Sequence, residues 1–263
     1  MFAAQRGMLR YALAKAGVSY GIYTLDDFLD GVLAPCKVYI FANTNYLTDS
    51  QITQIQSRLN NEAATAIWQY APGFLGPNGA SVSRVSTLTG IQVSQSDGYG
   101  YTNGKGLMAG YNWGISLGLP TQNQNPLSPR LIVTDLSAEV LGVYETDGLV
   151  STARKKVNNF ESIFTGEFAL GDFNNPAAVG YSPSPDALRA LLQVAGAHIW
   201  STTDDVVITD GNLLVIHAAA AGPDTISLPA GVTATPLGGG PSSTGMLNIN
   251  FSRVGQTLWF RLS

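Results

Sequence analysis

Residues 184–196 read SPDALRALLQVAG, and this stretch separates two kinds of sequence. Its leucines recur at helical spacing and Gly196 follows them, which predicts a helix that ends at this glycine. On its N-terminal side, segments typical of helices alternate with apolar segments typical of strands. On its C-terminal side, every segment reads as a short strand between Gly, Pro or Asp turns. The sequence therefore predicts two domains, residues 1–196 and residues 197–263.

The first domain carries the pattern of an α/β fold. An opening helix ends at Gly17, and short strands are predicted at residues 20–23, 37–41 and 66–70. Residues 48–51 have the spacing of a capping box, and the apolar residues after them recur at helical intervals. Strands and helices joined by short links predict a flavodoxin-like, doubly wound and mostly parallel sheet. Further strands are predicted at residues 131–133 and 162–164.

The second domain reads as a small antiparallel β-sandwich. Strands are predicted at residues 198–200, 206–208, 213–216, 225–228, 247–251 and 257–260. Asp210-Gly211 stands between two of them and is a strong hairpin signal. Leu247, Ile249 and Phe251 alternate with asparagines, so one face of that strand should be buried and the other hydrated.

Composition excludes several kinds of function. Charged residues make up 12% of the 263 residues, about half of the usual share, and the net charge is -4. Because phosphate binding needs clustered Lys and Arg, nucleic acid is not an expected partner. One cysteine and two histidines leave little material for a metal centre, and neither a metal nor a cofactor is expected. No apolar run has membrane-spanning length and no secretory signal is recognisable, so no membrane partner is expected and the compartment stays open.

A resemblance to a known family rests on three stretches. They are residues 13–27, residues 37–48, and the junction at residues 195–200 with the strands that follow it. Together they resemble the C-terminal region of multidomain glycoside hydrolases. There, a class I glutamine-amidotransferase-like domain, akin to the trimerisation domain of some β-galactosidases, precedes a β-sandwich. The resemblance implies a homo-oligomer, an upstream catalytic domain and a carbohydrate as ligand.

One departure from this pattern decides against amidotransferase activity. A working amidotransferase places a nucleophilic cysteine on the sharp turn after a central strand and pairs it with a histidine. The corresponding turn here is Tyr70-Ala71-Pro72-Gly73, and Cys36 precedes a strand instead of following one. Whether the chain is an enzyme at all stays open, and any activity would be that of a glycoside hydrolase.

The carboxylates that could serve a glycosidase are few. Hydrolysis of a glycosidic bond needs two carboxyl groups about 5 to 9.5 Å apart. The candidates are Asp97, Asp135 and Glu139. The spacing of Asp135 and Glu139 would place both on one helical face, where like charges ordinarily just face solvent.

Five residues are candidates for binding a sugar. Asn43 and Tyr70 follow predicted parallel strands, and ligands bind at such strand ends in a doubly wound sheet. Tyr99, Tyr101 and Trp113 lie in the Gly- and Asn-rich stretch between residues 74 and 130, which is predicted to form surface loops or a decorated insertion. Rings there could stack on sugars. Packing of these rings on their own domain is the alternative. The other tryptophans, at 68, 200 and 259, fall within strand patterns and are interpreted as core.

Three functions remain open at this stage. The first is an accessory, oligomer-forming region of a glycoside hydrolase, without a complete catalytic site of its own. The second is a small stand-alone hydrolase of glycosidic or ester bonds, and the third is a carbohydrate-binding module. With few charges to keep copies apart, self-association through the α/β domain is expected, with Met8, Leu9 and Leu13 of the opening helix taking part.

Overall fold

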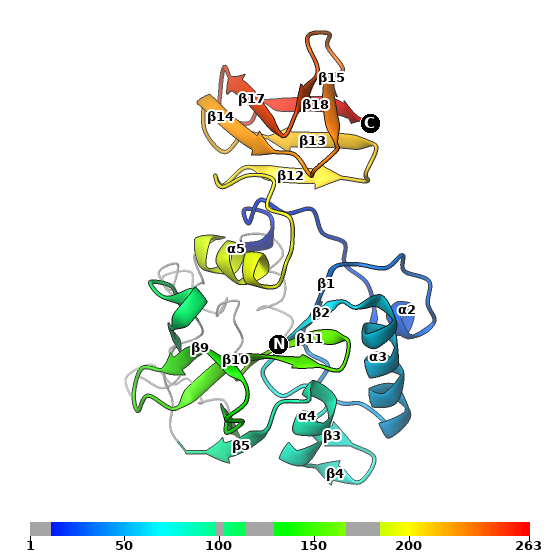
Figure 1. The fold of residues 1–263 in the computed structure, drawn as a ribbon, viewed down its shortest axis with the longest axis vertical. Coiled ribbons are helices and arrows are strands. Elements are labelled where there is room, and N and C mark those ends of the chain that lie inside the picture. Colours follow the sequence, from blue (N-terminus) through cyan, green and yellow to red (C-terminus); the bar gives the residue numbers. More distant parts are fainter. Residues whose placement is uncertain (1–11, 98–101, 114–128, 167–184) are drawn as a thin grey trace.

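A computed structural model describes residues 12–97, 102–113, 129–166 and 185–263. The ribbon has a larger part, which holds the helices, and a smaller all-strand part at one end of the long axis (Figure 1). Helix α5 and the described part of the N-terminal segment lie where the two parts meet. No helix among these residues is long and apolar enough to cross a membrane.

The larger part is organised around a mixed sheet of seven strands. Their order across the sheet is β1, β2, β11, β10, β9, β6 and β7. The bounds are β1 Val38–Phe41, β2 Thr65–Gln69, β6 Thr102–Gly104, β7 Asn112–Trp113, β9 Glu139–Tyr144, β10 Val150–Val157 and β11 Phe160–Thr165. Strands β1, β2 and β11 are parallel, whereas β11, β10, β9, β6 and β7 pair antiparallel. The doubly wound flavodoxin-like sheet is therefore not confirmed, because its parallel portion has three strands and the rest is antiparallel.

Helices cover both faces of the parallel strands. They are α2 Leu25–Leu29, α3 Asp49–Glu62, α4 Val82–Thr89, a 3-10 turn η2 Gly106–Met108, and α5 Pro185–Val194. The apolar faces of α3 and α4 pack in one cluster with Phe41, Trp68 and Phe164. Helix α5 packs in a second cluster with Ile67 and Ile163. All five residues of β2 are buried, so this strand is covered on both faces.

The strongest local prediction is confirmed at α3. Thr48 caps the helix, its hydroxyl accepting from the N–H of Gln51 while the Gln51 side chain accepts from the N–H of Thr48. Ile52, Ile55 and Leu59 are the buried residues of this helix. The predicted helix at 184–195 and the strands at 37–41, 66–70 and 162–164 are present as α5, β1, β2 and β11.

One prediction about the larger part is wrong. Residues 20–23 form no strand, and Tyr20, Ile22 and Tyr23 are exposed. The strand predicted at residues 131–133 is confirmed as β8 Arg130–Val133, which pairs with β5 Val93–Ser96 in a separate two-stranded sheet. The stretch at 74–130 is not all loop, since it also contains α4, β6, β7 and a small hairpin of β3 Leu75–Gly76 and β4 Gly79–Ala80.

The smaller part is built from two antiparallel sheets. The five-stranded sheet has the order β12, β13, β18, β15, β16, and β14 pairs with β17 in the other. The bounds are β12 Val206–Thr209, β13 Leu213–His217, β14 Gly222–Ser227, β15 Thr233–Pro236, β16 Ser243–Thr244, β17 Met246–Phe251 and β18 Thr257–Leu262. Their inner faces share a core that includes Leu214, Ile226, Leu247 and Phe260. The hairpin predicted at Asp210-Gly211 is confirmed, but residues 198–200 form no strand.

Candidate functional site

The predicted strand-end residues meet at one edge of the sheet. Phe41 lies opposite Trp68 in the parallel pair, so Asn43 and Tyr70 both follow two positions later at the carboxyl ends. Both have a φ of 58°, in the left-handed region that non-glycine residues rarely adopt. The Tyr70 hydroxyl donates to the Pro129 carbonyl at 3.0 Å, and burial raises the pKa of this phenol to about 12. Tyr70 therefore stays a neutral donor, held inside the protein.

The loops beyond these strand ends are tied to each other. The N–H of Gly73 donates to the Thr44 carbonyl at 2.7 Å, and that of Leu75 to the Asn45 carbonyl at 2.8 Å. The Arg84 side chain donates to the carbonyls of Gly73 and Leu47. This edge is thus closed by hydrogen bonds within the chain.

The three aromatic side chains predicted to stack on sugars have different outcomes. Tyr99 and Tyr101 lie outside the described residues. Trp113 is 4% exposed and packs in the cluster beneath α5, next to Met108 and Leu141. A ring in that position is surrounded by protein, which is the alternative kept open from the sequence. Its role in binding a sugar stays a prediction.

The three candidate acids do not converge. Asp97 is exposed, and Glu139 lies on strand β9, so it shares no helical face with Asp135. Asp135 accepts from Lys155 Nζ at 2.7 Å, from the N–H of Gln92 at 3.1 Å and from Ser137. Burial alone would raise the pKa of Asp135, but these hydrogen bonds hold it well below the usual range. A carboxyl that stays ionised in this way is a poor general acid.

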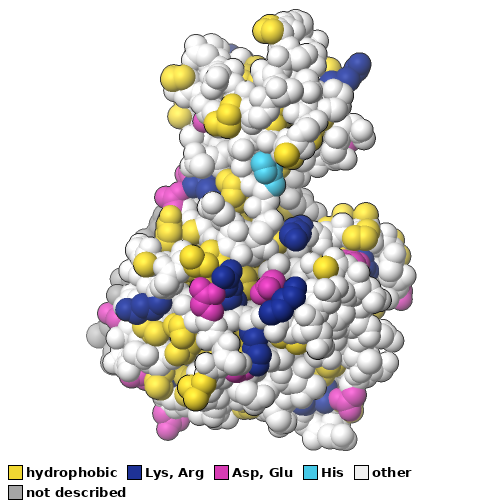
Figure 2. Space-filling view, in the orientation of Figure 1, with side chains coloured by type: hydrophobic (Ala, Val, Ile, Leu, Met, Phe, Trp, Pro, Cys, Tyr) yellow, Lys and Arg dark blue, Asp and Glu magenta, His cyan; other side chains and the backbone are white. Residues whose placement is uncertain are grey.

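Asp135 is one of three acids that pair with the basic run of β10, whose successive side chains point to opposite faces of the sheet. Glu139 bonds to Arg154 at 2.6 Å, and Lys156 lies 3.9 Å from Glu161. The basic run at residues 154–156 is therefore neutralised by acids on neighbouring strands and turns. Figure 2 shows Lys and Arg side chains interspersed with Asp and Glu across the middle of the larger part. The described side chains in this view form no basic patch of the kind that binds phosphate.

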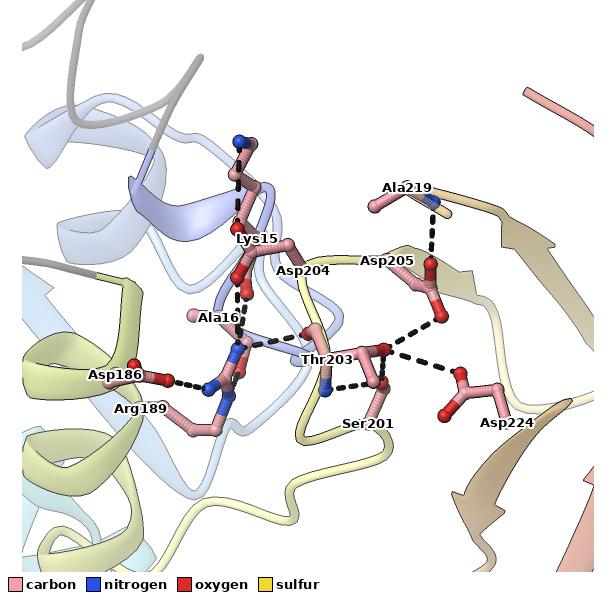
Figure 3. Close-up of polar contacts among 10 residues, drawn as sticks. All are labelled: Lys15, Ala16, Asp186, Arg189, Ser201, Thr203, Asp204, Asp205, Ala219 and Asp224. Atoms are coloured by element: carbon pink, nitrogen blue, oxygen red, sulfur yellow. Dashed lines mark hydrogen bonds and ion pairs between the residues drawn. The ribbon is translucent and has the colours of Figure 1, made fainter. Parts of the chain in front are cut away.

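A polar network lies where the larger and smaller parts meet (Figure 3). Arg189 of α5 is 7% exposed and donates to the carbonyls of Ala16 at 3.3 Å, Lys15 at 2.8 Å and Thr203 at 2.9 Å. Its remaining nitrogen pairs with Asp186. One guanidinium thus joins the N-terminal segment, α5 and the connection to the smaller part.

The network continues into the smaller part through Thr203. Its hydroxyl lies 2.8 Å from a carboxylate oxygen of Asp205 and 3.2 Å from one of Asp224 (Figure 3). The Ser201 and Thr203 hydroxyls are 2.6 Å apart, and the N–H of Ala219 donates to Asp205 at 2.6 Å. Asp205 precedes β12 and Asp224 lies on β14. The pair therefore joins the segment that connects the two parts to a strand of the smaller part.

The two carboxyls of this pair have different environments. Burial and the hydrogen bond with Asp205 raise the pKa of Asp224 to about 6. Burial also acts to raise the pKa of Asp205, but the hydrogen bond from Asp224, the N–H of Ala219 and the nearby His217 lower it. A proton on Asp224 therefore lets it donate to an ionised Asp205. Two carboxylates are too few for a metal centre, and the described residues contain no group of three or more His, Cys, Asp or Glu side chains placed to hold one.

Close backbone packing reinforces the junction. The N–H of Trp200 donates to the Gly17 carbonyl at 2.7 Å. Gly17 has a φ of 68°, and a Cβ there would lie 1.9 Å from the carbonyl oxygen of Ser201. Only glycine fits this contact. Sequence reasoning missed this network, although an arginine on the apolar face of the 184–195 helix and the polar run at residues 201–205 were signals for it.

Comparison with known proteins finds solved structures of similar fold but no protein of similar sequence. No protein-family model matches the chain, and no curated protein matches its sequence. A β-galactosidase from Bacillus circulans sp. alkalophilus matches with a TM-score of 0.60 at 16% identity, over 96% of this chain and 36% of the enzyme. The β-galactosidase of Rahnella sp. R3 matches with a TM-score of 0.57 at 13% identity, over 95% and 35%. That of Halorubrum lacusprofundi matches with 0.56 at 12% identity, over 99% and 36%.

These matches have one consequence for the architecture. The chain spans about a third of the length of each β-galactosidase that it matches. Its larger and smaller parts together therefore have the fold of a partial region of these enzymes.

Proposed function

We propose that the chain is the accessory, oligomer-forming region of a glycoside hydrolase and has no complete catalytic site of its own. In this proposal residues 1–196 are the amidotransferase-like layer that associates, and residues 197–263 are the β-sandwich module. The observation that carries it is the coverage: nearly all of this chain matches about a third of three β-galactosidases. The reaction would then belong to an upstream catalytic domain.

The state of the carboxylates supports this proposal. Asp135 and Glu139 are each bound to a basic side chain, and Asp97 lies in the open. Asp224, whose pKa is raised, and its neighbour Asp205 are bound to hydroxyls and to a backbone N–H at the junction. The bound carboxyls thus serve structural contacts instead of forming the open acid and nucleophile pair of a glycosidase.

An exposed apolar surface supports self-association. Around α2, the side chains of Ile22, Tyr23 and Val32 are 64%, 59% and 72% exposed. Arg58 holds this segment in place, since it donates to the Phe28 and Leu33 carbonyls and lies 4.4 Å above the Phe28 ring. Exposed apolar groups on a fixed backbone are typical of protein contact surfaces. Leu13, by contrast, is 5% exposed and packs inside the chain's own core, so it is unsuited to the contact predicted for it.

Light scattering across a dilution series tests the proposed association. The wild type should form an oligomer that dissociates on dilution. The double variant Ile22→Glu, Tyr23→Glu should raise the protein concentration at which half of the oligomer has dissociated by at least about tenfold. Each substitution places a charge in the contact. Val254→Glu, at another exposed apolar position, is the matched control. A wild type that is monomeric at every concentration would remove the oligomer-forming role.

A further inference from the structure

Four apolar side chains form a row across the outer face of the five-stranded sheet. Ile208 lies opposite Val215, and Val215 lies opposite Trp259. The N–H of Leu237 donates to the Trp259 carbonyl at 3.0 Å, which extends the row past the end of β15. Because directly paired residues point to the same side of a sheet, Ile208, Val215 and Trp259 share one face. We call these four residues the Trp259 row.

This row faces solvent. Ile208 is 59% exposed, Trp259 50% and Leu237 53%. Their sequence neighbours Leu214, Ile216 and Phe260 point the other way into the core. Trp68 and Trp200 are buried as interpreted from the sequence, whereas the interpretation of Trp259 as core is wrong, since its strand has one wet face. Contiguous exposed apolar side chains on a rigid sheet are a candidate binding surface.

Hydrogen-bonding side chains stand on both sides of the row. Thr257 and Arg261 lie two residues before and after Trp259 on β18, so they share its face. His217 lies opposite Thr257, and its Nδ1 is 2.9 Å from the Thr257 hydroxyl. Within the described part of the chain the Arg261 guanidinium has no hydrogen-bond or ion-pair partner. The face therefore combines one flat ring with polar side chains beside it, among them the Arg261 guanidinium.

We propose that the Trp259 row binds a polysaccharide chain, with a sugar ring stacked on the Trp259 indole. The flat face of a pyranose presents C–H groups, which suit the electron-rich face of an aromatic ring. The hydroxyls at its edge then reach Arg261 on one side and His217 on the other. Neighbouring strands are about 4.8 Å apart, so a row across four strands runs for roughly 14 Å, the length of a short oligosaccharide.

The size of the row argues against a protein occupant. Successive outward positions on one strand are about 7 Å apart, so the row covers on the order of 100 Å². A stable dimer buries about 800 Å² per partner around a continuous apolar centre. Polar side chains next to Trp259 interrupt any wider apolar area. A narrow strip with hydrogen-bonding edges fits a sugar chain better than a second copy of this chain.

Sugar binding by the Trp259 row goes beyond the accessory role and does not depend on oligomer formation. The row lies on the smaller part, whereas the exposed residues around α2 (Ile22, Tyr23 and Val32) lie on the larger part. The row is also a different sugar-binding surface from the loop aromatics considered in the sequence.

Affinity electrophoresis of the full chain tests the proposal, in gels containing β-1,4-galactan, xylan, laminarin or dextran. We expect at least one of these polysaccharides to retard the wild type. Trp259→Ala should weaken the retardation at least about tenfold, and Trp259→Phe should keep part of it because the ring is retained. Val254→Ala removes an exposed apolar side chain of the same module outside the strands and should leave the retardation unchanged.

Tryptophan fluorescence gives a second measurement on the same proteins. Because Trp68, Trp113 and Trp200 are buried, a spectral change on titration with the retarding polysaccharide should come from Trp259 and vanish in Trp259→Phe. No retardation by any of the four polysaccharides, or retardation unaffected by Trp259→Ala, would overturn the proposal. So would a change in oligomeric state caused by Trp259→Ala, since this would show the row to be a protein interface.

Discussion

Arg189 is the side chain that connects most segments at the junction. Its buried guanidinium donates to carbonyls at Lys15, Ala16 and Thr203, three groups from two distant parts of the chain. A buried carbonyl that loses its donor costs about 1 to 3 kcal/mol, so removal of this side chain affects several groups together. A lysine cannot replace it, because an ammonium lacks the planar set of donors.

Replacement of Arg189 should destabilise the whole chain. For Arg189→Ala we expect the free energy of unfolding in urea to fall by about 3 kcal/mol, and Arg189→Lys should recover less than half of this loss. Arg253→Ala, at an exposed arginine, is the control and should change little. A loss below about 1 kcal/mol for Arg189→Ala would show that the junction does not depend on this side chain.

The pH dependence of stability can show whether Asp135 has a structural role. Its pKa is lowered from the usual 3.8, so its ionised form is favoured by folding. The stabilisation is therefore complete above about pH 4 and is lost as the pH falls below that value. Asp135→Asn should lower the free energy of unfolding by about 2 kcal/mol at pH 7, and the difference from wild type should shrink toward pH 3. Asp97→Asn is the control, and a pH-independent difference would contradict this assignment.

At the scale of elements, the Asp205–Asp224 pair links the connecting segment to β14. The pKa of Asp224 is raised from 3.8 to about 6, so the folded state binds a proton that the unfolded state releases at lower pH. The resulting stabilisation is present in full below about pH 4 and is lost as the pH rises through about 6. The junction should therefore be tighter in mild acid than at neutral pH.

Asp224→Asn tests this pH dependence. An asparagine can donate to the Asp205 carboxylate at any pH, so the variant should lose the fall in melting temperature between pH 4 and pH 6.5 that the wild type shows. At pH 8 it should be more stable than the wild type by about 1 kcal/mol. Thermal melts at a series of pH values measure both effects, with Asp97→Asn as the control. An Asp224→Asn variant that melts in parallel with the wild type would show that the pair shares no proton.

Local signals decided which elements could be predicted. Helix α3 was predictable because Thr48 and Gln51 cap it within one turn and its apolar residues follow a single period. The hairpin of β9 and β10 was missed, although Asp147-Gly148 between two alternating segments marks such a turn. Once formed, it extends the sheet antiparallel from β11 and replaces the doubly wound arrangement.

Among the site residues, too, positions set by a local pattern could be predicted, whereas contacts between distant segments could not. The strand-end positions of Asn43 and Tyr70 followed from the strand pattern. The contacts of Arg189 with residues 173 and 174 positions away could not be read from any local pattern. Similarly, the exposure of Trp259 depends on which face of the sheet β14 and β17 cover.

At the scale of the whole molecule, the larger and smaller parts should behave as one rigid body. The N–H of Ala197 donates to the Leu192 carbonyl at 2.9 Å, and Trp200 is bound to Gly17, so the connection is not a free linker. Limited trypsin and thermolysin digestion should first cut between residues 74 and 129, with the junction intact. A dominant early cut next to Gly196 would show that the two parts move independently.

The measurement that tests the central claim most directly is glycosidase turnover by the purified chain. The assay uses a panel of aryl β-glycosides, including aryl β-galactosides, with protein shown by circular dichroism to be folded. We expect a rate indistinguishable from that of buffer, because Asp135 and Glu139 are bound to basic side chains and Asp205 and Asp224 are bound at the junction. Saturable turnover that is abolished by Asp135→Asn or by Glu139→Gln, in variants that remain folded, would contradict the account and identify the chain as a hydrolase in its own right.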